Sequence, residues 1–351
     1  IGNSQDLDIT HNSVGQITNK TGDLYVSSTG SNTDIIFYSA IGATPTEFFR
    51  MNGGTGKNTF SRPVDISGNL TATGKLCVNG QTAVYVPGGN FTGSMYFGNG
   101  GTLGSYTSSN NGRFNTGVGN GSLFKNTTGC GNTAVGYDSL ECNTTGYYNV
   151  AVGNKSLCTN TIGQLNTAIG YEALKVNVDG NYNVAIGAYV LDSNIGGDGN
   201  TGVGYKTLCD NTTGSYGTSY GYQSMRFNTT GYGNTAMGYQ AAFYTTTGFD
   251  NTAMGKQALF CSSTGCFNTA VGKSALYCNS ANSNTGIGYN ALYHARGTNA
   301  NNSTGIGYAA GRFIANGSTH NTAPKQAVFI GSNSKSKLAT GTNEIVIGYN
   351  A

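Results

Sequence analysis

The sequence has no tryptophan, only four prolines and three histidines, and few charges: Lys, Arg, Asp and Glu make up 9% of its 351 residues. A disordered chain has high charge and few aromatics, whereas this chain has little charge and 23 tyrosines. No apolar run approaches the ~18–20 residues that a membrane-spanning helix needs. The net charge is +3, with acids and bases interspersed and no Lys/Arg stripe, so nucleic-acid binding has weak support.

Residues that perform chemistry are also sparse. His11, His294 and His320 lie far apart in the sequence, and the acidic residues are scattered. An enzyme needs a convergent acid, base or nucleophile, which this spacing does not offer. No Cys-x-x-Cys motif or Cys/His cluster indicates a zinc site. We therefore expect no catalytic residues, no metal and no cofactor, and we rank glycan cleavage by paired carboxylates as the least favoured alternative.

Glycine is abundant, and it marks an internal repeat. Fourteen of the 56 glycines anchor copies of one motif, with the consensus N-T-A-[VIM]-G-Y-x-x-L-x-x-N-x-T-G-x-x. The first nine intervals between anchors are all 17 residues, and the last four are 16, 19, 24 and 17. A period this short predicts one coil per repeat, stacked along an axis into a rod. The anchors are Gly119, Gly136, Gly153, Gly170, Gly187, Gly204, Gly221, Gly238, Gly255, Gly272, Gly288, Gly307, Gly331 and Gly348.

The composition of each repeat predicts a parallel β-solenoid. Val, Ile and Tyr suit short strands, and Asn, Thr and Gly suit tight corners. Equivalent residues of successive coils would lie ~4.8 Å apart. Val135 and its equivalents would form one apolar column, Leu140 and its equivalents a second, and Asn132 and its equivalents a hydrogen-bonded amide ladder. A second glycine, such as Gly146, follows ten residues after most anchors and indicates another tight turn or a positive φ.

The chain divides into three predicted segments. Residues 1–80 hold short strand-like runs between turn residues, residues 81–110 are a Gly-, Ser- and Asn-rich junction, and residues 111–351 form a solenoid of about 14 repeats. A 17-residue coil carries few apolar side chains, which is a thin core for one chain. We therefore expect three chains to pack about a common axis, although the sequence also leaves two chains or one open. The chain begins at Ile1 without Met or a signal-peptide pattern, so we expect a processed or trimmed piece.

Cysteine spacing suggests staples. Cys130 and Cys142 lie 12 residues apart, as do Cys266 and Cys278 in the same repeat register. Cys261 and Cys278 lie 17 apart, so they would stack on adjacent coils within disulfide reach. These five cysteines would link coils or chains in an extracellular rod. The alternative interpretation is that they are small buried residues at a variable position.

Two further features concern partners. A tyrosine such as Tyr137 follows many anchors, and such a column either binds glycans by ring stacking or forms a structural ladder; we favour the ladder. The longer intervals near the C-terminus predict surface loops at residues 294–304 and 312–326. Insertions on one face of a solenoid often form the binding face, so we place receptor contact at His294, Arg296, Arg312 and His320.

The repeat also carries a family resemblance. Residues 132–140 and 143–146 resemble the head repeats of trimeric adhesins, which build a left-handed parallel β-roll with three chains to a rod. They resemble even more closely the repeats in long tail fibres of bacteriophages and in fibres of some large viruses. Residues 6–12, 22–26 and 64–74 resemble the N-terminal pattern of phage fibres, and residues 343–350 resemble the stretch before a C-terminal trimerisation chaperone.

The resemblance implies a homotrimeric fibre in which a short-strand trimeric β shaft precedes the solenoid. It implies a location on a virion tail fibre or a cell surface, no membrane insertion, and a host-surface glycan or protein as partner. We therefore expect a structural and adhesive fibre segment that gives reach and attaches to a host surface. The alternatives are a bacterial surface adhesin or a self-assembling extracellular filament and, least favoured, a glycan-cleaving tailspike.

Overall fold

The computed structural model describes residues 112–295, 300–313, 320–337 and 342–351 in full and, before them, the backbone of six strands. All the described residues lie in strands, turns or irregular segments and none in a helix, so this part of the chain is all-β, as predicted. The chain forms two compact units, Ile1–Thr71 and Ala72–Ala351.

The strands before the repeats pair mainly antiparallel. In the first unit, β1 (Ile35–Ala40), β2 (Pro45–Met51) and β3 (Asn58–Phe60) form a sheet in that order. The second unit begins with β4 (Gly74–Val78), β5 (Gln81–Val86) and β6 (Met95–Phe97), which also pair antiparallel. β6 then pairs in parallel with β7 (Thr116–Val118), the first strand of the repeats. The fibre-like runs at residues 6–12 and 22–26 lie outside the described residues.

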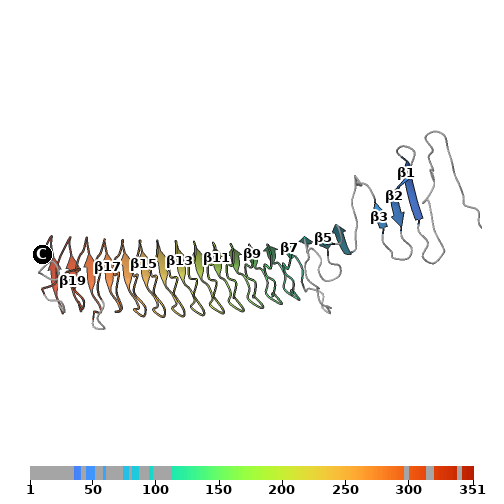
Figure 1. The fold of residues 1–351 in the computed structure, drawn as a ribbon. Coiled ribbons are helices and arrows are strands. Elements are labelled where there is room, and N and C mark those ends of the chain that lie inside the picture. The colour runs from blue at the N-terminus through green and yellow to red at the C-terminus, as the bar shows by residue number, and fades with distance from the viewer. Residues whose placement is uncertain are drawn as a thin grey trace, which may run out of the picture. The chain divides into compact units, whose positions relative to one another are not determined.

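The repeats form a parallel β-solenoid with one three-residue strand per coil (Figure 1). Neighbouring strands pair in register, with Ala134 opposite Ala151 and Val135 opposite Val152. The 17-residue repeat therefore equals one turn of the solenoid, which confirms the predicted fold. The strands after β7 are β8 (Thr133–Val135), β9 (Val150–Val152), β10 (Thr167–Ile169), β11 (Val184–Ile186), β12 (Thr201–Val203), β13 (Thr218–Tyr220), β14 (Thr235–Met237), β15 (Thr252–Met254), β16 (Thr269–Val271), β17 (Thr285–Ile287), β18 (Thr304–Ile306), β19 (Val328–Ile330) and β20 (Ile345–Ile347).

Outside the strand, each coil is a series of tight turns held by its neighbours. Three non-glycine residues in a typical coil adopt left-handed backbone angles, as at Asp138 (φ 52°), Leu140 (φ 49°) and Tyr148 (φ 55°). Each such residue costs roughly 1 kcal/mol. Hydrogen bonds between coils offset this cost: the Leu140 amide donates to the Ser156 carbonyl at 3.0 Å, and the Tyr148 amide to the Cys130 carbonyl at 2.9 Å. The shape of a coil therefore depends on stacking more than on local preference.

The two glycines of a coil are required for different reasons. All fourteen anchors have φ between 118° and 140°, a region that is open essentially to glycine alone. A Cβ on Gly255 would also lie 2.7 Å from the carbonyl carbon of Gly272. The second glycine has no positive φ, contrary to one of the two predicted reasons. At Gly180 the reason is space, because a Cβ there would lie 2.6 Å from the Gly197 carbonyl oxygen.

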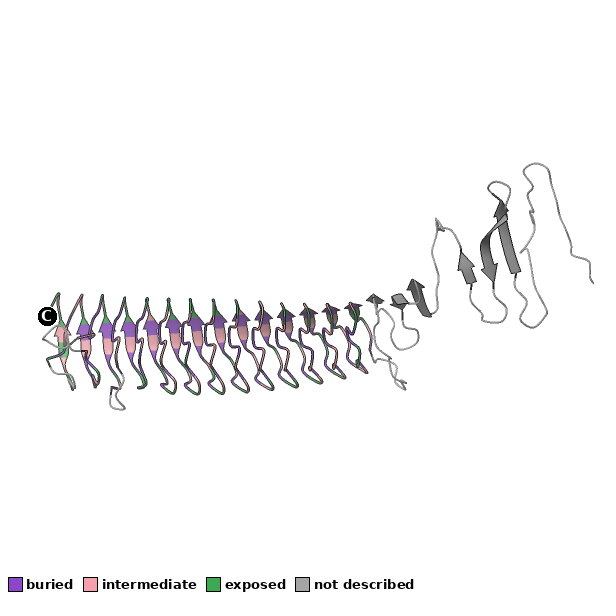
Figure 2. Cartoon of the chain, in the orientation of Figure 1, coloured by how far each residue is buried: buried purple, intermediate pink, exposed green. Residues whose placement is uncertain are grey.

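The core of each coil is narrow and consists of an alanine column and a leucine column. Figure 2 shows that the buried parts of the strands line up from coil to coil. Ala134 and Leu140, like most of their equivalents, are fully buried. Val135 and its equivalents form the predicted apolar column, but they lie on the outer face of the strand, where Ile169 is 39% exposed. The middle residue of the strand faces the leucine column, and there is little room between the two columns. A Cβ on Gly286, an alanine-column position, would already lie 3.0 Å from Leu276 Cγ.

Two columns of buried asparagines complete the interior. In the predicted column, the Asn149 amide donates to Asn132 Oδ1 at 2.9 Å, and Asn132 Nδ2 donates to the Gly146 carbonyl at 2.9 Å. A second column was not predicted; in it Asn143 Nδ2 donates to Asn126 Oδ1 at 2.7 Å and to the Gly146 carbonyl at 2.9 Å. This second asparagine column comprises Asn126, Asn143, Asn160, Asn177, Asn194, Asn211 and Asn228. Because every amide is satisfied within the column up to Asn211, the polar core stabilises the rod and fixes the register of its coils.

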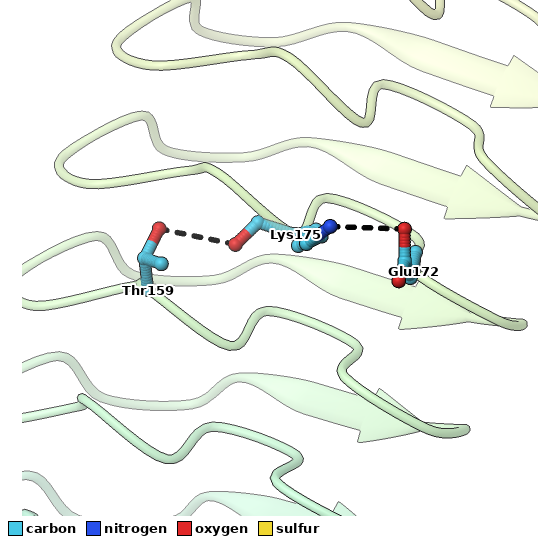
Figure 3. A network of polar contacts seen from close by, with 3 residues as sticks. All are labelled: Thr159, Glu172 and Lys175. Atoms are coloured by element: carbon cyan, nitrogen blue, oxygen red, sulfur yellow. Dashed lines mark hydrogen bonds and ion pairs between the residues drawn. The ribbon is translucent and has the colours of Figure 1, made fainter.

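Surface side chains add further links between coils. Thr159 Oγ1 donates to the carbonyl of Lys175 on the next coil at 3.0 Å, and Lys175 Nζ lies 3.0 Å from Glu172 Oε2 (Figure 3). Lys175 is 34% and Glu172 13% exposed, and an ion pair within one coil, three residues apart, does not link neighbouring coils. The bond from the threonine to the backbone is the contact that joins two coils.

Candidate interaction surfaces

An apolar stripe runs along the strand face of the solenoid. The stripe consists of the residues that directly precede the anchor glycines, and we call it the outer column. Every member is aliphatic, Met or Tyr, and none is fully buried; Ile186 is 38%, Met237 41% and Ile347 67% exposed. The outer column consists of Val118, Val135, Val152, Ile169, Ile186, Val203, Tyr220, Met237, Met254, Val271, Ile287, Ile306, Ile330 and Ile347. An exposed apolar stripe of this length is typical of an interaction face.

The tyrosines that follow the anchors stack on one another. The rings of Tyr205 and Tyr222 lie 5.3 Å apart, and those of Tyr222 and Tyr239 lie 5.5 Å apart with planes within 5°. Stacked rings cover part of each other's faces, which leaves less ring face open to a sugar. This arrangement favours the structural ladder over glycan stacking.

A second set of rings, which we call the aromatic ladder, lies on the segment after the buried leucine. It comprises Phe227, Phe243, Tyr244, Phe260, Tyr277, Tyr293, His294, Phe313 and His320. Phe260 and Tyr277 stack at 5.0 Å, and Tyr277 and Tyr293 at 4.8 Å. At its two ends, Arg226 Cζ lies 4.9 Å from the Phe227 ring centroid and Arg312 Cζ 4.6 Å from that of Phe313. These cation–π contacts cover the terminal ring faces.

The structure brings together three of the four residues that the sequence placed at a receptor contact. The rings of His294 and His320 lie 3.9 Å apart, and Arg312 Cζ lies 4.9 Å from the ring of Tyr293, the neighbour of His294. His320 reaches this cluster because an isolated antiparallel bridge pairs it with Phe313. Arg296 lies outside the described residues. Sequence reasoning missed the aromatic ladder to which the cluster belongs, although aromatic residues recur there at intervals of 16 or 17.

The cysteines whose side chains are described, Cys130, Cys142, Cys261, Cys266 and Cys278 among them, are thiols in the structure. Burial raises the pKa of Cys158 and that of Cys209 to about 12, so neither is a reactive thiolate at neutral pH. Cys261 and Cys278 occupy the same column on adjacent coils, where the Cys261 amide donates to the Tyr277 carbonyl at 2.8 Å. The predicted staples therefore remain a prediction, with this pair the best placed.

Charge is distributed unevenly along the chain. Residues 1–250 contain 11 Lys or Arg and 14 Asp or Glu, whereas residues 251–343 contain seven Lys or Arg and no Asp or Glu. The interspersed pattern expected from the sequence therefore holds only for the first part. Lys256 and Lys273 are exposed and occupy the tyrosine column, each 5.4 Å from a ring centroid, that of Tyr239 and that of Tyr289 respectively.

Within the described part of the chain, no three His, Cys, Asp or Glu side chains come together as ligands for a metal ion. The same residues contain no helix with the length and apolar character needed to cross a membrane. Comparisons with protein-family models, with curated proteins and with solved structures found no match to this chain.

Proposed function

We propose that the chain is a structural and adhesive segment of a homotrimeric extracellular fibre of the tail-fibre type. The solenoid gives reach, a short-strand trimeric β shaft precedes it, and its last coils attach to a host surface. The outer column is the observation that carries this proposal. It leaves an apolar side chain exposed or partly exposed in every coil, along the whole solenoid.

The partner that best matches the length and the period of this stripe is another copy of the chain. A partner must be as long as the rod and repeat with the same period, and a parallel copy meets both requirements. Completing the burial of a half-exposed Val, Ile or Met stabilises by roughly 1 kcal/mol. Fourteen such positions then supply on the order of 10 kcal/mol per chain against the cost of association. The resemblance to trimeric adhesin heads and tail-fibre repeats supports three chains.

Host attachment is proposed for the last coils. There the repeat intervals lengthen to 19 and 24 residues, and the His294, Arg312 and His320 cluster joins the aromatic ladder. Loops that depart from the repeat can vary without disturbing the stacked core, which suits a surface that contacts a receptor.

A pair of variants tests the assembly. Ile169→Lys/Ile186→Lys places two charges in the outer column, and Ile162→Lys/Ile195→Lys makes the same change at two exposed isoleucines elsewhere on the coils. We expect the first double variant to have the mass of one chain, with unchanged far-UV circular dichroism, and the control to remain trimeric. If both variants keep the wild-type mass, the outer column is not the assembly face.

A further inference from the structure

We propose that the coils of Lys256 and Lys273 bind an acidic polysaccharide, with these two lysines holding a carboxylate between them. This inference rests on the proposed function, because it names the chemistry of the surface to which the fibre attaches. Its first support is the charge of the segment that contains them, residues 251–343. Seven Lys or Arg without any Asp or Glu give this segment a formal charge of +7. The solenoid coils before it, residues 112–250, contain six Lys or Arg and eight Asp or Glu, so residues 251–343 are the part of the solenoid sequence that attracts a polyanion.

The second support is the geometry of the lysine pair. Along the tyrosine column, the order is Tyr239, Lys256, Lys273 and Tyr289, one residue per coil. Lys256 Nζ lies over the ring of Tyr239, and Lys273 Nζ lies over the ring of Tyr289. Each lysine thus contacts the tyrosine on its far side, so the two ammonium groups lean away from each other. An anion placed between them would be attracted to both.

The coils of the two lysines contain no acidic residue that would compete with a bound anion for these charges. The residues beside the lysines along the chain are Gln257 and Ser274. Both lysines are exposed. The nearby surface is rich in Asn, Ser and Thr, whose amides and hydroxyls suit the hydroxyl groups of a sugar chain.

Nucleic acid fits this surface less well. Single strands are held by bases that stack on aromatic faces. Here the Phe260 and Tyr277 rings stack on each other, and lysines lie over Tyr239 and Tyr289, so these rings offer less open face to a base. Each strand of duplex DNA carries one charge per ~3.4 Å, whereas neighbouring coils place the Cα atoms of the two lysines ~4.8 Å apart along the axis, and the ammonium groups lean further apart. A glycan with about one carboxylate per sugar is closer to that spacing.

The site is compatible with the proposed assembly. Lys256 and Lys273 follow the anchor glycine, whereas Met254 and Val271 of the outer column precede it. A parallel assembly would bring identical lysines together if it buried them, which is unfavourable. The lysines therefore stay at the rim of the chain–chain interface, where a polymer lying along the fibre can reach them.

The test is a binding titration of the full chain with polygalacturonate, with neutral dextran and duplex DNA as reference polymers, at salt concentrations from about 50 to 300 mM. We expect binding to polygalacturonate that weakens with salt, and little binding to dextran. Lys256→Gln/Lys273→Gln should lower the affinity about tenfold and flatten the salt dependence. The control Lys155→Gln/Lys206→Gln removes the same charge from coils outside the basic segment and should change the affinity less than about twofold.

Three results would overturn the inference: no binding of wild type to polygalacturonate, equal losses in the two double variants, or equally tight binding of DNA. None of these would affect the assembly mass, so the inference can fail while the fibre proposal stands. Lys256→Arg/Lys273→Arg keeps both charges and should keep the affinity. If the glutamine variant misfolds, a loss of affinity in this folded arginine variant would count against a charge-based site.

Discussion

The second asparagine column ends at buried polar atoms that lack hydrogen-bond partners in the described part of the chain, and a single substitution should supply one. It runs from Asn126 to Asn228, and the next two equivalent positions are Thr245 and Ser262. Asn228 Oδ1, Thr245 Oγ1 and Ser262 Oγ are buried and have no hydrogen-bond partner among the described residues. An unsatisfied buried polar atom costs about 1–3 kcal/mol. The substitution Thr245→Asn should therefore stabilise the solenoid.

The size of the gain follows from intact coils of the same column. Asn211 Nδ2 donates to Asn194 Oδ1 at 2.7 Å and to the Gly214 carbonyl at 2.9 Å. An asparagine side chain introduced at position 245 would make the equivalent bonds to Asn228 Oδ1 and to the Gly248 carbonyl. Two hydrogen bonds at about 0.5–1.5 kcal/mol each give a net stabilisation of about 1–3 kcal/mol.

The assay is guanidinium unfolding followed by circular dichroism, with the midpoint and slope compared at constant protein concentration. Thr247→Asn makes the same change at an exposed position two residues away and should stay within about 0.5 kcal/mol of wild type. Asn211→Thr breaks the intact column and should destabilise by about 2–4 kcal/mol. If Thr245→Asn is no more stable than Thr247→Asn, the column is not what stabilises these coils.

Three further predictions concern the anchors, a buried acid and the thiols. Gly255→Ala should destabilise by about 2–4 kcal/mol in the same unfolding assay. Gly196→Ala should have a small effect, because φ is not positive there and only the Asp179 side chain is close. Equal losses of stability in the two variants would contradict this. Burial raises the pKa of Asp192, so the contribution of this carboxyl to stability should fall as pH rises from about 4 through the raised value. Asp192→Asn should therefore be the more stable protein at pH 7 but not at about pH 3, and a pH-independent difference would refute that reasoning. The coil spacing places the Cα atoms of Cys261 and Cys278 ~4.8 Å apart. After treatment with a disulfide-exchanging oxidant, mass spectrometry should therefore detect these two cysteines in one linked peptide pair. Recovery of both as separate alkylated peptides would exclude the staple.

The sequence predicts the coil but not which way each strand faces. A 17-residue period and an anchor glycine are sufficient for the solenoid, because each repeat stacks only on its neighbours. A three-residue strand presents Ala to one side and Val or Ile to the other, and hydrophobicity alone would bury the larger residue. The space beside Leu276 decides otherwise, since even a Cβ at Gly286 is tight there.

The candidate surfaces were predictable only in part. His294, Arg312 and His320 could be placed in the final coils from the longer intervals, but their contact depends on an antiparallel bridge within an insertion. The aromatic ladder joins residues from successive coils. The contact between Phe260 and Tyr277 can be predicted only when the sequence is aligned by its 17-residue coil length. The excess of basic residues was visible in the sequence, although the overall charge of +3 conceals it.

The central claim is that copies of this chain associate through the outer column, and the native mass tests it most directly. Light scattering on the purified protein, with and without reductant, should give about 109 kDa, which is three times the chain mass of 36.2 kDa. The reductant should not change that mass if apolar burial holds the chains together. A stable species of 36.2 kDa at micromolar concentration would contradict the account and leave a solenoid that folds and works as a single chain.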